Sequence, residues 1–145
     1  MALSFLAVHP PRTRTASENP VTLHGGIFHI EFIPGDFETS NPSKDQWYFV
    51  EHLPPRTESN PQSQINPPYH WHGHQDETFQ VQQGTMRVTR EGKDSFVKTG
   101  ETVMIPCGTY HTFYNASSEE EMKVAIKLDP TTRERDETFF RKFSH

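Results

Sequence analysis

The chain has 145 residues, a net charge of −5 at pH 7 and a single cysteine. This length favours one domain, the charge without any basic run argues against a nucleic-acid partner, and one cysteine excludes an intrachain disulfide or a cysteine-rich zinc site. No apolar run reaches the roughly 18 residues of a membrane-spanning helix, and the apolar residues 3–8 are too few, and lack a preceding basic region, for a convincing signal peptide. We therefore expect a cytoplasmic protein that does not cross a membrane.

The first part of the chain predicts a flexible arm followed by two strands. Residues 1–20 are polar and interrupted by prolines, which is typical of a poorly ordered terminus. Residues 26–33 and 46–53 are rich in aromatic and branched apolar side chains and end at proline-containing turns, as strands do. By strand alternation His29 and His52 could face the interior of the fold, so both are candidates for a pocket wall.

A proline-rich segment follows at residues 54–68. It contains five prolines among serine, asparagine and glutamine, and it is longer than the usual connection in a compact domain. Loops of this length are commonly functional or disordered. Because this one leads directly into a group of histidines, we interpret it as a lid or rim rather than a plain linker.

The histidines at positions 70, 72 and 74 form the most informative stretch of the chain. Residues two apart in a strand point to the same face, so His70 and His72 can converge on one point. Glu77 then shares a face with Phe79 and Val81, which places a carboxylate on an apolar, inward side. Neutral imidazoles with a carboxylate suit iron, manganese, nickel, copper or zinc.

The rest of the chain predicts further strands and then a change of period. Alternation of apolar residues indicates strands around residues 85–89, 102–105, 111–115 and 123–128, separated by glycine-containing or charged turns. From Thr131 the spacing becomes helical, because Thr131 with Glu134 fits a capping box and three phenylalanines follow on one helical face. We expect a short C-terminal helix over residues 131–145.

Two spaced motifs carry a resemblance to a known family. The first reads His-x-His, four residues, Glu, six residues, Gly, and consists of His70, His72, Glu77 and Gly84. The second reads Gly, five residues, Pro-x-Gly, two residues, His, three residues, Asn, and consists of Gly100, Pro106, Gly108, His111 and Asn115. Together and in this order, the motifs resemble those of the cupin superfamily.

The resemblance implies an all-β fold, a single antiparallel jelly-roll β-barrel, over residues 21–130. It implies four metal ligands, which are His70, His72, Glu77 and His111. It further implies a divalent transition metal, with Fe(II) the first choice and Mn, Ni or Zn the alternatives, and a small-molecule substrate. Since only 32% of the residues are hydrophobic, we also expect a homodimer that pairs around residues 28–33.

The expected chemistry leaves alternatives open. Four protein ligands leave two positions on an octahedral ion, which could serve a dioxygenase acting on an oxygenated, aromatic or polyketide-like substrate. They could equally serve Lewis-acid chemistry such as isomerisation, decarboxylation, cyclisation or dehydration. Glu77 and His74 are the candidate catalytic residues, with His74 either a general base beside the open positions or a solvated loop residue. A register of His72, His74 and Glu77 is the alternative ligand set, and a non-catalytic metal-containing binding protein is the alternative function.

Overall fold

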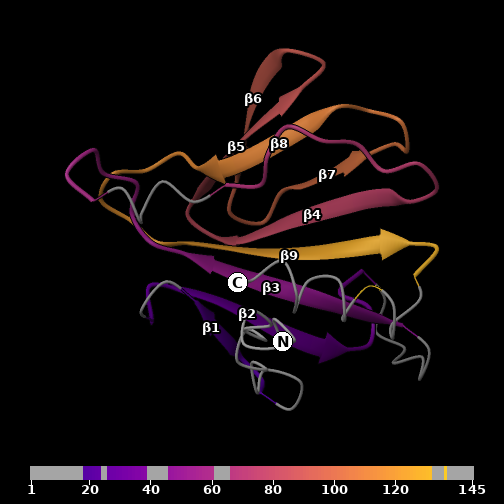
Figure 1. The fold of residues 1–145 in the computed structure, drawn as a ribbon, viewed down its shortest axis with the longest axis horizontal. Coiled ribbons are helices and arrows are strands. Elements are labelled where there is room, and N and C mark those ends of the chain that lie inside the picture. Colours follow the sequence, from indigo (N-terminus) through magenta and orange to yellow (C-terminus); the bar gives the residue numbers. More distant parts are fainter. Residues whose placement is uncertain (1–17, 24–25, 39–45, 61–65, 132–135, 137–145) are drawn as a thin grey trace, which may run out of the picture.

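The computed structural model describes residues 18–23, 26–38, 46–60, 66–131 and 136. The regular structure of this part of the chain is almost entirely strand, which confirms the predicted all-β class (Figure 1). The strands are β1 (Val21–Leu23), β2 (Phe28–Pro34), β3 (Trp47–Leu53), β4 (Asp76–Gln83), β5 (Thr85–Arg90), β6 (Lys93–Lys98), β7 (Thr102–Ile105), β8 (His111–Asn115) and β9 (Met122–Asp129).

The strands pair antiparallel in two sheets, which gives the predicted jelly-roll barrel. The larger sheet has the order β1-β2-β3-β9-β4-β7 and the smaller one has the order β6-β5-β8. Figure 1 shows β9 running between β3 and β4, with the smaller sheet on the side of β4 and β7. Strand β9, the last of the barrel in the sequence, therefore lies in the middle of the larger sheet. It pairs with β3 on one side and with β4 on the other.

The interior between the sheets is filled by side chains that alternate along the strands. On β4, Phe79 and Val81 are fully buried and Glu77 is 4% exposed, so the predicted inward face of this strand is confirmed. Aromatic rings pack at one end, where the ring centroid of Trp47 lies 5.7 Å from that of Phe32 and 5.9 Å from that of Phe49. Burying such large rings compensates for the small number of apolar residues.

Gly84 makes the turn from β4 to β5 and has no room for a side chain. Its φ angle is +79°, and an added Cβ would lie 2.5 Å from the carbonyl oxygen of Glu121. Glycine is therefore required twice, by the left-handed backbone and by the close approach of the chain before β9.

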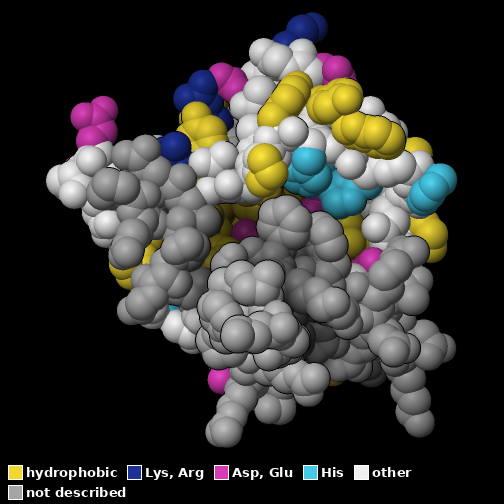
Figure 2. Space-filling view, viewed as in Figure 1, with side chains coloured by type: hydrophobic (Ala, Val, Ile, Leu, Met, Phe, Trp, Pro, Cys, Tyr) yellow, Lys and Arg dark blue, Asp and Glu magenta, His cyan; other side chains and the backbone are white. Residues whose placement is uncertain are grey.

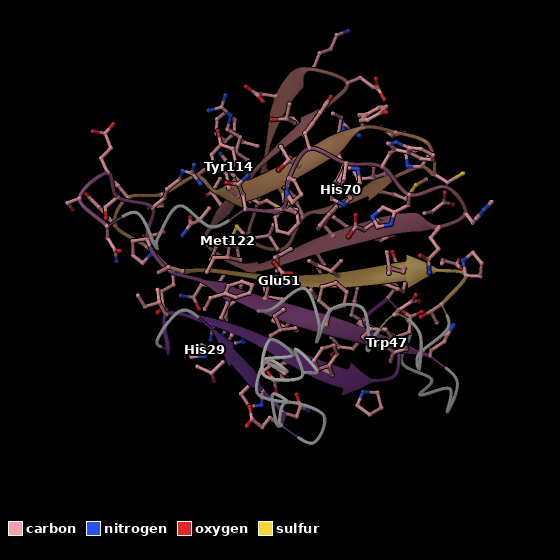
Figure 3. All side chains as sticks on the ribbon, viewed as in Figure 1. His29, Trp47, Glu51, His70, Tyr114 and Met122 are labelled. Carbon is pink, nitrogen blue, oxygen red and sulfur yellow. The ribbon has the colours of Figure 1, made fainter. Side chains whose placement is uncertain are left out.

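The expectation that His29 and His52 face the interior is wrong. On β3 the residues of the core are Trp47, Phe49 and Leu53, so the even-numbered His52 points to the outer face. There it lies beside His29, which is labelled in Figure 3, and the two ring centroids are 6.0 Å apart. Val50 on that outer face is also buried, which is why alternation in the sequence did not distinguish the two faces.

The other strands lie close to the predicted positions: β7 and β8 match residue for residue, whereas β1 was not predicted. Of the predicted arm, residues 1–17 lie outside the described residues. Of the predicted C-terminal helix, only Thr131 and Asp136 are described; Asp136 is helical, buried and bonded to Gln75 at 3.0 Å. Within the described ranges no helix has the length and apolarity needed to cross a membrane.

Candidate metal centre

The two motifs meet at a pair of backbone hydrogen bonds between His70 and His111. The N–H of His70 donates to the carbonyl of His111 at 3.0 Å, and the N–H of His111 donates to the carbonyl of His70 at 2.8 Å. The expectation of a regular strand through His70 and His72 is not met, because His70 makes an isolated bridge and His72 lies in an irregular segment. Their rings nevertheless converge, with centroids 5.0 Å apart.

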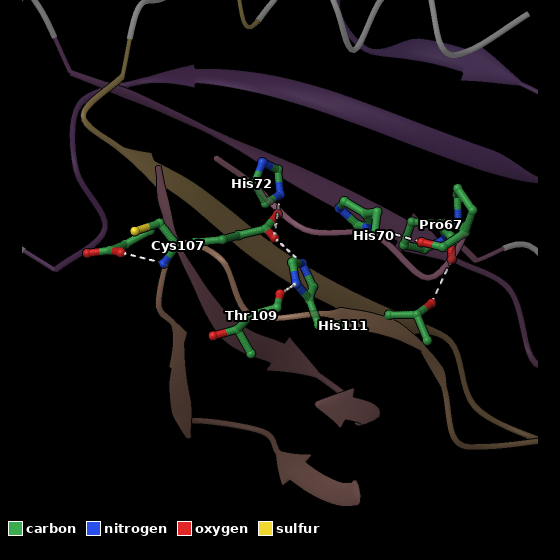
Figure 4. A network of polar contacts seen from close by, with 10 residues as sticks. Pro67, His70, His72, Cys107, Thr109 and His111 are labelled. Carbon is green, nitrogen blue, oxygen red and sulfur yellow. Dashed lines mark hydrogen bonds and ion pairs between the residues drawn. The ribbon is translucent and has the colours of Figure 1, made fainter. Parts of the chain in front are cut away.

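Four side chains gather at this meeting point. His70, His72, Glu77 and His111 each offer one ligand atom, and these atoms all lie within 4.8 Å of one another. The Oε2 atom of Glu77 lies 2.7 Å from Nε2 of His111 and 3.2 Å from Nε2 of His72 (Figure 4). Glu77 and His111 are buried, whereas His70 and His72 are partly exposed. The cluster is thus closed on its interior side and reachable from outside.

Backbone carbonyls fix the orientation of two of the rings. Nδ1 of His70 lies 2.7 Å from the carbonyl oxygen of Pro68, and Nδ1 of His111 lies 2.9 Å from that of Thr109 (Figure 4). A carbonyl can only accept, so Nδ1 carries the proton in both rings and Nε2 is left to bind at the centre. An outer hydrogen bond of this kind is the usual support of a metal-binding histidine.

The carboxylate and the histidines shift one another's pKa values. Burial by itself would raise the pKa of Glu77, but hydrogen bonds from His111 and His72 lower it to about 2. Burial would lower the pKa of His111, yet its hydrogen bonds with Glu77 and the Thr109 carbonyl raise it. Burial lowers the pKa of His70. At neutral pH the site therefore contains a carboxylate and at least one neutral imidazole, which are the forms that bind a metal.

The turn of the second motif holds the first motif in place. The N–H of Gly108 donates to the carbonyl of His72 at 2.7 Å, and the N–H of Cys107 donates to the carboxylate of Asp76 at 2.8 Å. On the other side the hydroxyl of Thr112 donates to the carbonyl of Pro67 at 2.6 Å. Both ends of the histidine segment are thereby anchored to the segment that carries His111.

The donor set fits a divalent transition metal. Three imidazole nitrogens and one carboxylate oxygen are ligands of iron, manganese, nickel, copper and zinc. Within one cluster they supply one negative charge to a divalent ion, which leaves the site net positive and suited to an anionic or polarisable oxygen ligand. When bound, such an ion would supply Lewis acidity or, with a redox metal, electron transfer to a coordinated molecule.

His74 is not brought into the cluster. Its side chain is exposed, and among the described residues the four-member group contains His70 in its place. The geometry therefore favours the ligand set that contains His70 over the alternative set with His74. Whether His74 acts as a base stays a prediction.

An aromatic rim lies beside the histidines and consists of Tyr69, Trp71 and Tyr110. Tyr110 stacks on Tyr69 with ring centroids 5.6 Å apart and lies 6.2 Å from Trp71. All three are exposed, between 44% and 51%. Figure 2 shows histidines and hydrophobic side chains together on this face.

The fold and the cluster together define a barrel protein with a potential metal centre, and the comparison with known families is in agreement. Residues 49–128 match the family described as cupin domain. This stretch is more than half of the chain, and it contains both motifs. The chain belongs to the cupin family.

Relatives of known sequence or structure are distant. The oxidoreductase iacF of Pestalotiopsis fici is 36% identical over 66 residues, which cover 44% of this chain and 32% of that protein. This chain thus matches about a third of the length of the curated relative. KdgF from Halomonas sp. is 13% identical with a TM-score of 0.58, covering 81% of this chain and 91% of that one.

A second solved structure gives the same result. The predicted oxalate decarboxylase of Thermotoga maritima is 15% identical with a TM-score of 0.57, covering 79% of this chain and 95% of that one. At such low identity both structures are similar to this chain in fold alone.

Proposed function

We propose that this cupin is a metal-dependent enzyme acting on a small oxygenated organic substrate. The observation that carries the proposal is the cluster of His70, His72, Glu77 and His111, whose ligand atoms lie within 4.8 Å of one another. Four protein ligands leave two positions on an octahedral ion for a substrate, or for a substrate and dioxygen. The relative named as an oxidoreductase supports redox chemistry, and Fe(II) is accordingly the first candidate metal.

The protein's own residues have separable tasks in such a reaction. Glu77 and His111 form the buried wall of the site, and His70 and His72 form its exposed side. Phe79 and Phe113, whose ring centroids lie 4.9 Å apart, continue the interior beyond His111. The exposed rings of Tyr69, Trp71 and Tyr110 beside the cluster favour a substrate with an apolar or aromatic body and an oxygen function at the metal-binding end.

The experiment that tests the proposal is metal analysis followed by oxygen uptake. Protein purified without chelators should contain one divalent transition metal per chain, and the iron(II) form should consume oxygen with a catechol, a β-diketone or a keto acid. Oxygen uptake would identify the dioxygenase branch, whereas product formation without it would identify the Lewis-acid branch. A metal-free protein that takes up no divalent metal would contradict the proposal.

The alternative of a non-catalytic binding protein predicts a different pattern. Chelation would then lower the melting temperature sharply while no tested substrate is converted. Shortening the proline-rich segment within residues 61–65, which lie outside the described residues, should impair turnover in an enzyme but leave its metal content unchanged. In a binding protein with a structural metal, the same deletion should leave ligand binding unaffected.

The expected homodimer and the cytoplasmic location stay predictions. Sedimentation or light scattering at micromolar protein concentration would test the first, and a monomeric mass would contradict it.

A further inference from the structure

The barrel interior next to the metal-ligand cluster is filled by its own side chains. Phe79 on β4 lies opposite Ile126 on β9, which lies opposite Phe49 on β3, and all three are at most 1% exposed. Met86 of the smaller sheet is fully buried. A small-molecule site needs concave surface that a ligand can reach. Among the described residues, this interior therefore offers no free surface for the body of a substrate.

The aromatic rim, by contrast, offers exposed surface directly beside the cluster. Tyr69 and Trp71 lie on either side of His70 in the chain, and Tyr110 precedes His111. All three rim residues are about half exposed. The cluster is partly exposed through two of its histidines, and Figure 2 shows histidines and hydrophobic side chains together on this face. A molecule that reaches the cluster from outside therefore meets the rim.

The turn between β5 and β6 holds two residues of the rim in place. The N–H of Gly92 donates to the hydroxyl of Tyr69 at 3.0 Å. Glu91 is bonded twice to Tyr110: its carboxylate accepts from the N–H of Tyr110 at 2.8 Å, and its own N–H donates to the Tyr110 carbonyl at 2.9 Å. One short turn thus connects the two segments that carry His70 and His111.

The residue types of this turn indicate that the glutamate side chain has a use. Glu91 and Gly92 both have positive φ angles, +47° and +75°, as a tight hairpin turn requires. Asparagine, aspartate and glycine are the ordinary residues at such positions, because longer side chains disfavour the left-handed backbone. A glutamate in this place is explained by the bond that its carboxylate accepts from Tyr110.

The three rings form one continuous surface. Tyr110 stacks on Tyr69 with ring centroids 5.6 Å apart and planes inclined by 28°, and its centroid lies 6.2 Å from that of Trp71. The Trp71 ring also rests against the backbone of its own segment, because a Cβ added at Gly73 would lie 3.3 Å from Cζ3 of Trp71. Exposed rings that are held in a fixed arrangement are preorganised to stack with another planar group.

We propose that the aromatic rim is the subsite for the body of the substrate, which stays outside the barrel while its oxygen function reaches the metal-ligand cluster. This inference rests on the proposed function and narrows its substrate class. The substrate is a planar aromatic compound with two neighbouring oxygen atoms at one end and a further fused ring that stacks on the rim. Because the body is not enclosed, an added ring strengthens binding instead of preventing it.

The test compares two ligands that share their donor atoms and differ by one ring, catechol and 2,3-dihydroxynaphthalene. Both present the same pair of neighbouring hydroxyl groups to zinc-loaded protein, and calorimetry measures the dissociation constant of each. We expect the larger ligand to bind about tenfold more tightly to the wild type, as for one additional stacked ring. A substrate body that had to enter the filled interior would give the opposite order.

Substitutions in the rim should remove this preference. In Trp71→Ala and in Tyr110→Ala the ratio of the two dissociation constants should fall toward one, while zinc content stays that of the wild type. Phe96→Ala is the matched control, because Phe96 is an exposed ring on β6, opposite Arg87 on the outer face of the smaller sheet. The control should keep the full preference.

The turn provides a test that leaves all three rings in place. Glu91→Ala removes the acceptor of the Tyr110 N–H and should reduce the preference for the larger ligand. Glu91→Gln should restore it, because the amide oxygen can accept the same hydrogen bond. Equal preferences in the alanine and glutamine variants would show that the carboxylate of Glu91 does not position the rim.

The outcomes separate this inference from the proposed function. A wild-type protein that takes up no zinc, or a zinc-loaded protein that binds neither ligand, contradicts the proposed function. A zinc-loaded wild type without preference for the larger ligand, or rim variants that keep the full preference, overturns the rim as the subsite. Light scattering is measured on the same samples. A dimer that is lost in Trp71→Ala while the ligand preference is unchanged would assign the rim to a contact between two copies and overturn the proposal.

Discussion

Nε2 of His111 lies 2.7 Å from Oε2 of Glu77, although 34 positions separate the two residues in the chain. Nδ1 of His111 donates to the Thr109 carbonyl, and although burial lowers the pKa of this ring, its hydrogen bond with Glu77 raises it, which favours a proton on Nε2 as well in the metal-free protein. A metal ion that binds Nε2 must displace this proton. The ion pair is thus the form that the site takes without metal, and it keeps the ligands together.

The pH dependence of the metal-free protein should reflect this ion pair. The pKa of Glu77 is lowered to about 2 from its ordinary 4.5, so its contribution to stability is present above pH 4.5 and is lost as the pH falls toward 2. The pKa of His111 is raised above 6.5, so its contribution is present below pH 6.5 and is lost as the pH rises through the higher value.

Burial lowers the pKa of His70, which works in the opposite direction and weakens the fold as the pH falls below 6.5. Burial raises the pKa of Glu51 to about 8, so this group lowers stability as the pH rises above 4.5, and we expect metal-free protein to melt at the highest temperature in the lower part of the range between about pH 4.5 and 6.5. Melting curves across this range would check the expectation. In Glu77→Gln the maximum should flatten, and an unchanged profile in that variant would contradict the assignment.

Replacing single ligands should separate the two possible ligand sets. Replacing His70, His72 or His111 by alanine should lower metal affinity by about tenfold or more in each case, because the ion then loses one of its four bonds to the protein. Alanine at His74 should leave metal affinity unchanged, since its side chain is exposed and outside the cluster. Competition with a fluorescent chelator measures each affinity. Retained binding in His70→Ala with lost binding in His74→Ala would select the other register.

Thr112→Val should weaken metal binding without removing a ligand. It eliminates the 2.6 Å hydrogen bond from the Thr112 hydroxyl to the carbonyl of Pro67, which anchors the segment that presents His70. Outer contacts of this kind change metal affinity by roughly 10-fold or more when lost. Thr102→Val is the matched control, because Thr102 is exposed on β7. Equal metal affinities in the two variants would show that the anchor has no effect on the site.

Gly84→Ala should destabilise the barrel more than Gly92→Ala. Both glycines have positive φ angles, +79° and +75°, so each alanine costs about 1–2 kcal/mol of backbone strain. At Gly84 the new Cβ would also lie 2.5 Å from the Glu121 carbonyl oxygen, whereas at Gly92 nothing lies within 4 Å. Urea unfolding should therefore show a difference of at least about 1 kcal/mol between the variants. Equal losses in the free energy of unfolding would mean that the chain before β9 can move away from the new Cβ without destabilising the fold.

The sequence predicted the candidate site better than its surroundings. The four clustered residues were identified from motif spacing, because in a cupin barrel segments with this spacing lie side by side. The backbone geometry at His70 could not be predicted from the alternation of side chains. The rings of His70 and His72 converge from an isolated bridge as they would from a regular strand. Motif spacing therefore indicated which residues meet but not the backbone that holds them.

The position of Glu51 in the interior was missed for a physical reason. On β3, Phe49, Val50, Glu51 and Leu53 are all buried, so the strand has apolar residues at both parities. A charged residue in such a strand is ordinarily assigned to the outer face, and His52 was expected inside in its place. Only the pairing of Glu51 with Val124 and of Val124 with Val81 reveals which face belongs to the interior.

The position of β9 between β3 and β4 also determines when the site can be completed during synthesis. Until residues 122–129 have left the ribosome, β9 is missing from its place between β3 and β4. Both of these strands then have an unpaired edge. All four candidate ligands are by then already synthesised, yet the sheet that holds Glu77 beside the β1–β3 part has not formed. Metal capture should therefore follow translation of this strand, and a nascent chain stalled before residue 122 would expose two open edges to other chains.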